Sequence, residues 1–236
     1  MDFLKFMQLL EEKALWFARA DQFDDPLEGT FTDAELTSLR SSPNFNTPPQ
    51  GQELPIIDAT KGARLSAFIN CWRSGDSESM AMWDLYGKGS GTIAIKTTAA
   101  LLKEQCILFE REINIYNVEY IDWDTEHWDW NLISLFARKD KSYQHESEVR
   151  AIIFDMNAFV TQNKSVEQMR SWEAVTTQFA ASSLQGIRVP IEPSKIITEV
   201  VIGPRGQAWV EPLVSKILER YQLAIPIRSS NRLNPR

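Results

Sequence analysis

Residues 142–154 read SYQHESEVRAIIF, a polar segment that leads into an apolar run. The run from Val149 to Phe154 is rich in β-branched residues and has the length of a strand, so it predicts a buried β-strand. The polar residues before it place Glu146 and Glu148 at the mouth of that strand. A buried strand needs hydrogen-bonding neighbours, and the rest of the chain has to supply them.

The flanking sequence predicts those neighbours. Further strands are predicted at residues 14–18, 65–72, 92–96, 107–120 (one or two), 187–191, 196–202 and 224–228, and helices at 2–13, 32–40, 76–86, 125–137, 165–182 and 210–221. Strands outnumber helices and do not alternate strictly with them. The pattern therefore predicts an α+β fold, a single mixed domain over residues 1–236 with a central, largely antiparallel sheet flanked by helices.

Local signals mark two helix starts and one long connection. Thr32 and Glu35 have capping-box spacing, as do Ser165 and Gln168. Residues 41–62 are rich in proline and polar residues, which predicts a long irregular loop. No internal repeat interrupts this order.

The composition excludes several classes of protein. The chain has 236 residues, of which 43% are hydrophobic and 24% charged, so it can bury enough apolar surface to fold. The formal net charge of −7 argues against broad nucleic-acid or membrane-surface binding, because phosphate-binding surfaces need clustered lysine and arginine.

The N-terminal residues and the cysteines indicate where the chain works. The start MDFLKFMQLLEEK has charges among its apolar residues, unlike a signal or transit peptide, and no window resembles a membrane span. Cys71 and Cys106 have no neighbours at ligand spacing, which favours core thiols over zinc ligands or a disulfide. We therefore expect a cytoplasmic protein in a reducing compartment.

Glu146 and Glu148 are the first candidate site. In an extended chain, residues two apart point to the same side, so both carboxylates would face one cleft. Such a pair suits positioning a ribose hydroxyl and stabilising a developing oxocarbenium ion. The alternative is a solvated strand end, with Glu148 paired to Arg150 or to a nearby lysine.

Arg19 is the second candidate, within the segment LWFARADQFDDPLEG at residues 15–29. Its planar guanidinium matches the geometry of a phosphate or diphosphate. The alternative is a structural ion pair to Asp21, Asp24 or Asp25. The acidic residues that follow Arg19 have ordinary turn chemistry, so they need no catalytic role.

Residues 68–91 supply a third group of candidates. The sequence there is FINCWRSGDSESMAMWDLYGKGSG, in which Arg73, Ser74 and Tyr86 are the polar residues best placed to reach a cleft. The glycines after Tyr86 would let backbone approach a ligand closely. The spacing does not match a phosphate-binding loop, because no Ser or Thr follows Lys88 at the metal-binding position.

The acidic segment YIDWDTEHWDW at residues 120–130 invites a metal-site interpretation. It lacks the glycine of a calcium loop and the second histidine of a zinc helix, so we predict no metal site. Its tryptophans, Trp123, Trp128 and Trp130, offer a different interpretation, an aromatic surface that contacts a protein partner. His145, the other histidine, is more consistent with an orienting or surface role.

Four segments in order resemble a bacterial and phage family, the domain of unknown function numbered 2971. They are LWFARADQFDDPLEG, FINCWRSGDSESMAMWDLYGKGSGTIAI, KSYQHESEVRAII and IITEVVIGP, and together they span nearly the whole chain. The family label supplies no function. It supports one continuous domain.

The same chain bears a weaker resemblance to the ADP-ribosyltransferase fold. Arginine-type members have an Arg on the first core strand, a Ser-centred strand and an E-x-E near a later strand. The resemblance implies Arg19 as the dinucleotide ligand, Ser74 near the nicotinamide ribose, Glu148 as the catalytic glutamate and Glu146 beside it. Arg73 and Tyr86 would line the same site, with Tyr86 stacking on nicotinamide. The sequence NCWRS departs from the usual Ser-Thr-Ser, which puts the serine strand in doubt.

Three functions follow as hypotheses. The leading one is an NAD-consuming transferase that moves ADP-ribose to a macromolecular acceptor in conflict between bacteria and phage. The second is a non-catalytic sensor or protein-binding module that uses the tryptophan-rich segment. The third is a metal-dependent hydrolase that uses the acidic residues at 122–129.

Overall fold

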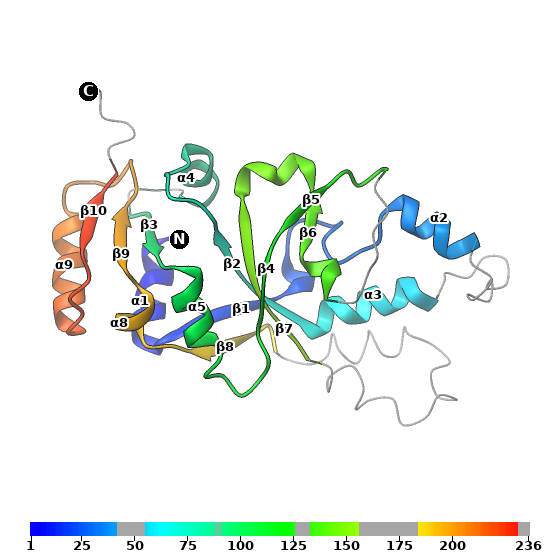
Figure 1. The fold of residues 1–236 in the computed structure, drawn as a ribbon. Helices are drawn as coiled ribbons and strands as arrows, with labels where there is room; N and C mark the ends of the chain where they lie inside the picture. Colours follow the sequence, from blue (N-terminus) through cyan, green and yellow to red (C-terminus); the bar gives the residue numbers. More distant parts are fainter. Residues whose placement is uncertain (42–54, 88, 90, 126–132, 156–183, 231–236) are drawn as a thin grey trace. The chain divides into compact units, whose positions relative to one another are not determined.

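The computed structural model describes residues 1–41, 55–87, 89, 91–125, 133–155 and 184–230 (Figure 1). The strands are β1 (Ala14–Arg19), β2 (Ala67–Arg73), β3 (Ile93–Lys96), β4 (Asn114–Asn117), β5 (Glu119–Ile121), β6 (Arg138–Asp140), β7 (Glu148–Phe154), β8 (Gly186–Pro190), β9 (Glu199–Ile202) and β10 (Ile227–Ser229). The α-helices are α1 (Phe3–Glu12), α2 (Asp33–Ser41), α3 (Pro55–Ser66), α4 (Met80–Tyr86), α5 (Ala99–Cys106), α8 (Pro193–Ile196) and α9 (Val210–Arg220). Three 3₁₀ helices in these ranges are η1 (Ala20–Gln22), η2 (Ser134–Phe136) and η3 (Lys141–Glu146).

The strands form three sheets within the described residues. The largest has the order β4-β7-β2-β1-β8, and the smaller ones are β10-β9-β3 and β5-β6. In the largest sheet β1 pairs antiparallel with β2, and β7 pairs antiparallel with both β2 and β4. The predicted mixture of helices with a largely antiparallel central sheet is confirmed. None of the described helices is both long and apolar enough to cross a membrane.

Several predicted elements differ from the structure in ways that have local causes. The prolines of residues 41–62 predict a loop, but α3 begins at Pro55, where a missing N–H costs nothing because the first helical turn leaves it unpaired. Helix α5 was not predicted, although Thr98 caps it by accepting a hydrogen bond from the Leu101 N–H at 3.2 Å. The predicted strand from residue 196 starts only at Glu199, after α8. The helices predicted at 125–137 and 165–182 lie largely or wholly outside the described residues.

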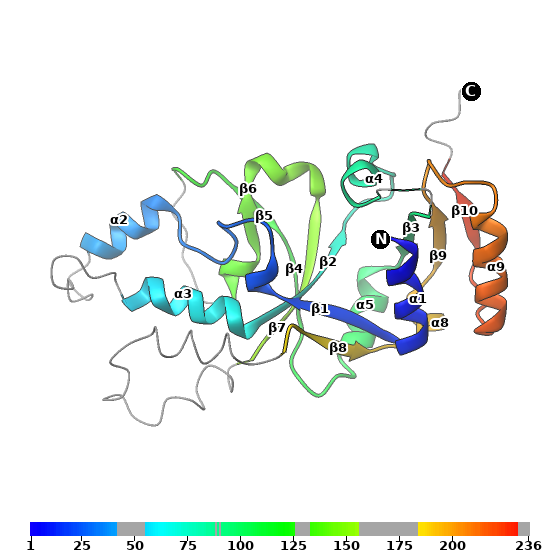
Figure 2. The ribbon, with the colours of Figure 1, turned by 180° about the vertical axis from the view of Figure 1, so that it is seen from behind.

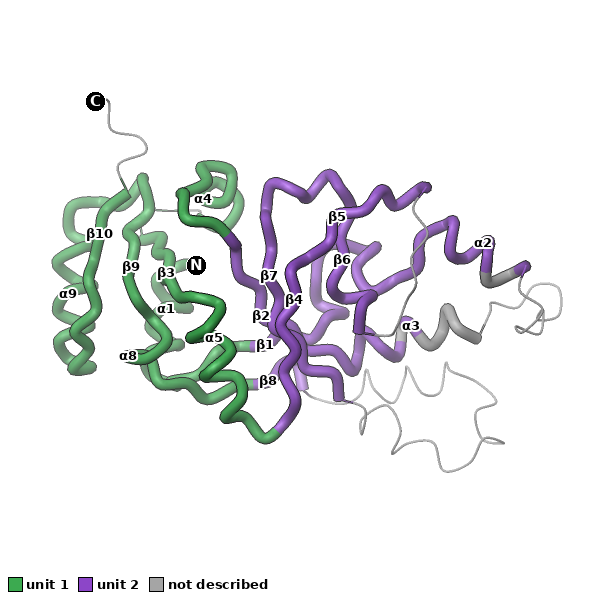
Figure 3. Tube along the Cα trace, viewed as in Figure 1, with its two compact units in different colours: residues 1–16, 75–110, 188–236 green, residues 17–74, 111–187 purple. Residues whose placement is uncertain are grey.

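The chain divides into two compact units, shown in Figure 3. Unit 1 comprises Met1–Trp16, Gly75–Glu110 and Arg188–Arg236, and unit 2 comprises Phe17–Ser74 and Arg111–Ile187. Neither unit is one continuous stretch of sequence, because the chain passes between them four times. The single domain over residues 1–236 stays a prediction.

In unit 1, the β10-β9-β3 sheet is accompanied by α9, which runs beside β10 in both views (Figures 1 and 2). Strand β9 pairs antiparallel with β3 and parallel with β10. The amphipathic spacing of α9 buries Val210, Val214, Ile217 and Leu218, and leaves the opposite side polar. Helix α1 follows the same rule, with Phe6 and Leu10 buried.

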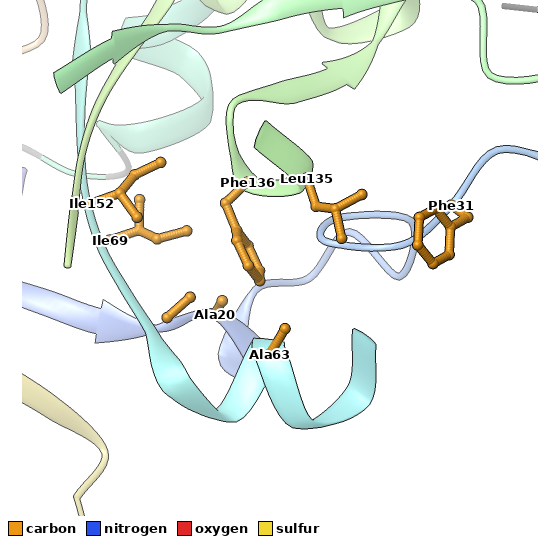
Figure 4. Packing of buried hydrophobic residues seen from close by; sticks show 8 residues of the cluster. Ala20, Phe31, Ala63, Ile69, Leu135, Phe136 and Ile152 are labelled. Carbon is orange, nitrogen blue, oxygen red and sulfur yellow. The ribbon is translucent and has the colours of Figure 1, made fainter. Parts of the chain in front are cut away.

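In unit 2, an apolar cluster lies on one face of the β2 and β7 pair. Residues directly opposite one another in an antiparallel pair share a face, and the register pairs Ile69 with Ile152. The ring of Phe136 lies beside these residues and points toward Ala20 and Ala63 (Figure 4). This cluster fixes η2 over the sheet.

The predicted capping box at Thr32 and Glu35 is present and has a second role. The Thr32 N–H donates to Glu35 Oε2 at 2.7 Å, and the Glu35 N–H donates to the Thr32 hydroxyl at 3.1 Å. The same carboxylate accepts two hydrogen bonds from Arg138, at 2.6 and 2.7 Å. Helix α2 is thereby tied to β6 through a fully buried charge pair.

We expect Phe136→Ala to destabilise the protein by ~3–5 kcal/mol, because it removes a fully buried ring and leaves a cavity. Ile107→Ala is the control, since Ile107 is 75% exposed, and it should change stability by less than ~0.5 kcal/mol. Urea unfolding of both variants checks this. Equal stability losses would show that the ring of Phe136 does not organise the core.

Candidate functional site

A group of charged residues in unit 2 lies on the same sheet face as the apolar cluster, toward one end of β2 and β7. The register pairs Cys71 with Arg150 and Arg73 with Glu148. These four side chains therefore belong to the face that also carries Ile69. Along that face the surface changes from apolar core to a cluster of charges.

Arg150 is the centre of this cluster and is 1% exposed. Its Nη2 donates to Glu148 Oε2 at 2.8 Å, its Nη1 donates to the Phe136 carbonyl at 2.8 Å, and it forms an ion pair with Glu28. The guanidinium also lies over the ring of Phe23, 6.0 Å from its centroid. Burial opposes the charge, but Glu28 and Glu148 outweigh burial and raise the pKa of Arg150.

Lys139 is the second buried cation of the cluster. Its Nζ donates to Glu146 Oε2 at 2.6 Å, lies 3.7 Å from Glu148 Oε2, and stands 4.4 Å from the centroid of the Tyr143 ring. Burial alone would lower the pKa of Lys139. The hydrogen bond to Glu146 and the charge of Glu148 more than offset this, so the pKa lies above its usual value.

Glu148 is the carboxylate that these two cations share. Its backbone N–H donates to the Tyr120 hydroxyl at 2.7 Å, and the thiol of Cys71 donates to its carboxylate. Burial would raise the pKa of Glu148, but Arg150, the thiol and Lys139 together lower it. The predicted pairing of Glu148 with Arg150 or a nearby lysine is confirmed for both cations, but the strand end is not solvated there, because the Glu148 side chain is 10% exposed.

Glu146 reaches the same cluster by a route that differs from the prediction. The chain is not extended there, because Glu146 ends η3 and Ser147 adopts a left-handed conformation with φ of 46°. Asp140 starts η3 by accepting a hydrogen bond from the Ser142 N–H at 2.9 Å. The two-residue alternation of a strand therefore does not apply, and Lys139 is what brings the two carboxylates together.

Ser74 and Arg73 lie at this end of the sheet. The Ser74 N–H donates to the Ser147 carbonyl at 2.7 Å, which joins the end of β2 to the residue between the two glutamates. Ser74 is exposed, and Arg73 is opposite Glu148 in the register. The structure thus gathers Arg73, Ser74, Glu146 and Glu148 in one region of unit 2.

Arg19 does not belong to that group. Its Nε and Nη2 donate to the two carboxylate oxygens of Asp21 at 2.6 and 3.0 Å, which confirms the structural alternative. The register pairs Arg19 with Phe68, so Arg19 lies on the opposite face of the sheet from Arg150 and Glu148. The structure therefore does not bring Arg19 and Glu148 together on one face of the sheet.

The remaining candidates are not among the residues of this cluster. Tyr86 belongs to unit 1 and is 57% exposed. Trp123 is buried, with the Arg138 guanidinium 5.4 Å from its ring centroid, so it is a core residue and not part of a binding surface. Trp128 and Trp130 lie outside the described residues.

The metal interpretation gains no support from the geometry. Asp122 accepts a hydrogen bond from the Asp124 N–H at 3.2 Å, as in an ordinary turn. Across the described ranges no group of three or more His, Cys, Asp and Glu side chains has the arrangement of a metal site. Glu126, His127 and Asp129 lie outside those ranges.

The two cysteines are not joined in a disulfide. Cys106 is buried as predicted, but Cys71 is exposed, so the prediction of a core thiol is wrong for Cys71. Burial nevertheless raises the pKa of the Cys71 thiol, and the charge of Glu148 raises it further.

Glu28, Lys139 and Arg150 were not identified as candidates in the sequence analysis. Glu28 follows a turn in which Asp25 Oδ1 accepts a hydrogen bond from the Leu27 N–H at 2.9 Å. That turn chemistry was predicted, but the burial of Glu28, 3% exposed, was not. Burial raises the pKa of Glu28 to about 7 despite the nearby charges of Arg150 and Lys139. The sequence held one signal that could have identified Arg150, because a charged residue within an apolar strand requires buried partners of opposite charge.

Comparisons with protein-family models, with curated proteins and with solved structures found no match to this chain. Both resemblances described from the sequence stay predictions.

Glu28 predicts a specific dependence of stability on pH. Its pKa in the folded protein, about 7, exceeds the ordinary value of 4.5, so the folded state binds the proton more tightly between these values. The contribution of Glu28 to stability is therefore present below pH 4.5 and is lost as pH rises through 7. Relative to Glu28→Gln, whose side chain stays neutral, the protein should lose on the order of 3 kcal/mol over this window. Urea unfolding at several pH values tests it, and parallel pH profiles for the two proteins would contradict the assignment.

Proposed function

We propose that the chain consumes NAD and transfers ADP-ribose to a macromolecular acceptor, in the setting of bacterium and phage conflict that the family resemblance implies. The observation that carries the proposal is the environment of Glu148. Its carboxylate is held ionised by Arg150 and Lys139, beside Glu146 and at the strand end that bears Arg73 and Ser74. NAD is a substrate in this reaction and not a resident cofactor.

The chemistry requires a fixed negative charge. When the glycosidic bond between nicotinamide and ribose breaks, the bonding electrons leave with nicotinamide and positive charge develops on the ribose. A carboxylate that is already ionised and oriented stabilises this charge without reorganisation. Glu148 supplies such a group, and hydrogen bonding to a ribose hydroxyl would position the sugar against it.

The other residues divide the remaining tasks. We assign Glu146 to orienting the incoming nucleophile and Ser74 to supporting the region around Glu148. Arg73 is assigned to the diphosphate, because Arg19 is engaged by Asp21 on the other sheet face. The resemblance implied Arg19 for that role and Arg73 as lining the same site, and only Arg73 shares the face of Glu148.

Glu148→Gln should reduce NAD hydrolysis by at least ~100-fold, because it removes the charge at nearly constant shape. Glu119→Gln is the control, since Glu119 is an exposed glutamate of unit 2, and it should leave the rate unchanged. Release of nicotinamide from NAD, with a thermal melt of each protein, measures the effect. Full turnover by a folded Glu148→Gln protein would remove Glu148 from catalysis.

Glu146→Gln should reduce transfer to an acceptor more than it reduces hydrolysis of NAD, because the residue is assigned to the nucleophile and not to the donor. Both rates are measured on one preparation, with polyarginine and host lysate as acceptors and labelled NAD as donor. An equal loss of the two rates would show that Glu146 acts on NAD, or that it supports the fold through its ion pair with Lys139, and would contradict its assignment to the nucleophile.

A further inference from the structure

Glu28 lies in the charge cluster at the end of a hydrogen-bonded turn, and it has no role in the proposed reaction. Gly29 has a φ of 72°, and a Cβ built on it would lie 2.5 Å from the Phe136 ring. Only glycine fits this position, so the turn is pressed against the apolar cluster. The Glu28 N–H is held by the Asp25 carbonyl at 3.3 Å. In this turn the side chain of Glu28 is buried and forms its ion pair with Arg150.

Glu28 and Glu148 share one guanidinium, Glu28 through Nη1 of Arg150 and Glu148 through Nη2. Arg150 forms ion pairs with both carboxylates, one from the turn and one from its own strand. Oε1 of Glu28 is the oxygen that pairs with Arg150 Nη1, so the charge of this carboxylate is compensated by Arg150. Burial removes water from this carboxylate, and burial outweighs the charge of Arg150, so the pKa of Glu28 is raised and the group accepts a proton more readily.

The charge balance of the cluster therefore depends on Glu28. The groups joined by these ion pairs are two cations, Arg150 and Lys139, and three carboxylates, Glu28, Glu146 and Glu148, which together carry one negative charge when all are ionised. Protonation of Glu28 makes the cluster neutral. The charged and titratable groups that interact with Glu28 are Arg150 and Glu148 of β7, Lys139 of β6, Cys71 of β2 and Asp25 of its own turn. Arg64 of α3 contacts the same turn, where its Nη1 donates to the Pro26 carbonyl.

We propose that Glu28 is a positioning residue that sets how completely Arg150 neutralises Glu148, and that it confers on the reaction a dependence on pH near neutrality. The inference rests on the proposed function for its effect on turnover. Ionised Glu28 shares Arg150 and leaves more of the Glu148 charge uncompensated. Protonated Glu28 releases Arg150 to Glu148 alone.

The direction of the pH effect follows from the chemistry. Positive charge develops on the ribose in the transition state, so a cluster with a net negative charge stabilises it better than a neutral one. Because burial raises the pKa of Glu28 to about 7, turnover should rise as pH increases from 6 to 8. Glu28 acts through Arg150 and does not touch the substrate, which distinguishes it from Glu148.

The first test is the pH profile of NAD hydrolysis in the unaltered protein and in Glu28→Gln and Glu28→Asp. The glutamine variant should turn over at pH 8 on the order of tenfold more slowly than the unaltered protein, and its profile should be flat between pH 6 and 8. The aspartate variant keeps the carboxylate and should restore the rise with pH. A glutamine variant that retains the rise would overturn the proposal.

The second test needs no catalytic activity and uses Cys71, which is accessible and interacts with both Glu148 and Glu28. A methanethiosulfonate reagent modifies the thiolate, and mass spectrometry follows the peptide that contains Cys71. Ionised Glu28 disfavours the thiolate, so Glu28→Gln should react several-fold faster than the unaltered protein above pH 8 and at the same rate below pH 6. Equal rates at every pH would overturn the coupling.

The two tests separate the inference from the proposed function. Absence of NAD turnover at every pH, with the expected difference in Cys71 reactivity, would reject the transferase and keep the electrostatic role of Glu28. Turnover that depends on Glu148 but has the same pH profile in Glu28→Gln would keep the transferase and reject the role of Glu28. The unaltered protein alone gives a third readout. Its Cys71 reactivity should rise less steeply than tenfold per pH unit around pH 7, because ionisation of Glu28 disfavours the thiolate over the same range.

Discussion

A buried guanidinium is the constraint on which unit 2 depends. Arg150 lies in a central strand and is 1% exposed, and an arginine cannot discharge itself by losing a proton. Its charge therefore has to be compensated where it stands. The compensation comes from three separate places: the turn that holds Glu28, the carbonyl of Phe136 at the end of η2, and Glu148 on the same strand. Removing one carboxylate partner of a buried pair typically costs ~3–5 kcal/mol.

Burying these charges costs desolvation free energy that an apolar core would not cost. Apolar residues of similar volume are often as stabilising as a buried ion pair, or more so. Here the cluster adjoins Cys71 and Ser74, which are both exposed residues. Two of its carboxyl groups have pKa values shifted in opposite directions, because that of Glu28 is raised and that of Glu148 is lowered. Opposite shifts in neighbouring carboxyl groups are typical of acid–base sites, and they favour a functional reason for the cluster.

The sequence could predict what is decided over short distances. The capping box of Thr32 and Glu35 spans a single helical turn, and the strand from Val149 reflects a local run of β-branched residues, so both were recognised. The pairing of Glu28 with Arg150 joins residues far apart in the chain, and no spacing rule encodes it. The left-handed backbone at Ser147 was also invisible, because serine carries no strong signal for that conformation.

The site residues were sorted by strand register, which a single sequence does not determine. Side chains alternate between the two faces of a sheet, so a shift of one residue exchanges the faces. Arg19 and Arg73 both end strands of the same sheet and both have the chemistry to bind a diphosphate. The register places Arg73 opposite Glu148, whereas Arg19 is opposite Phe68 on the other face. The resemblance selected the arginine by its order along the chain, and the geometry selects it by its face. Under the proposed function, an arginine on the face of Glu148 is better placed to meet a substrate that Glu148 contacts, and of the two arginines that one is Arg73.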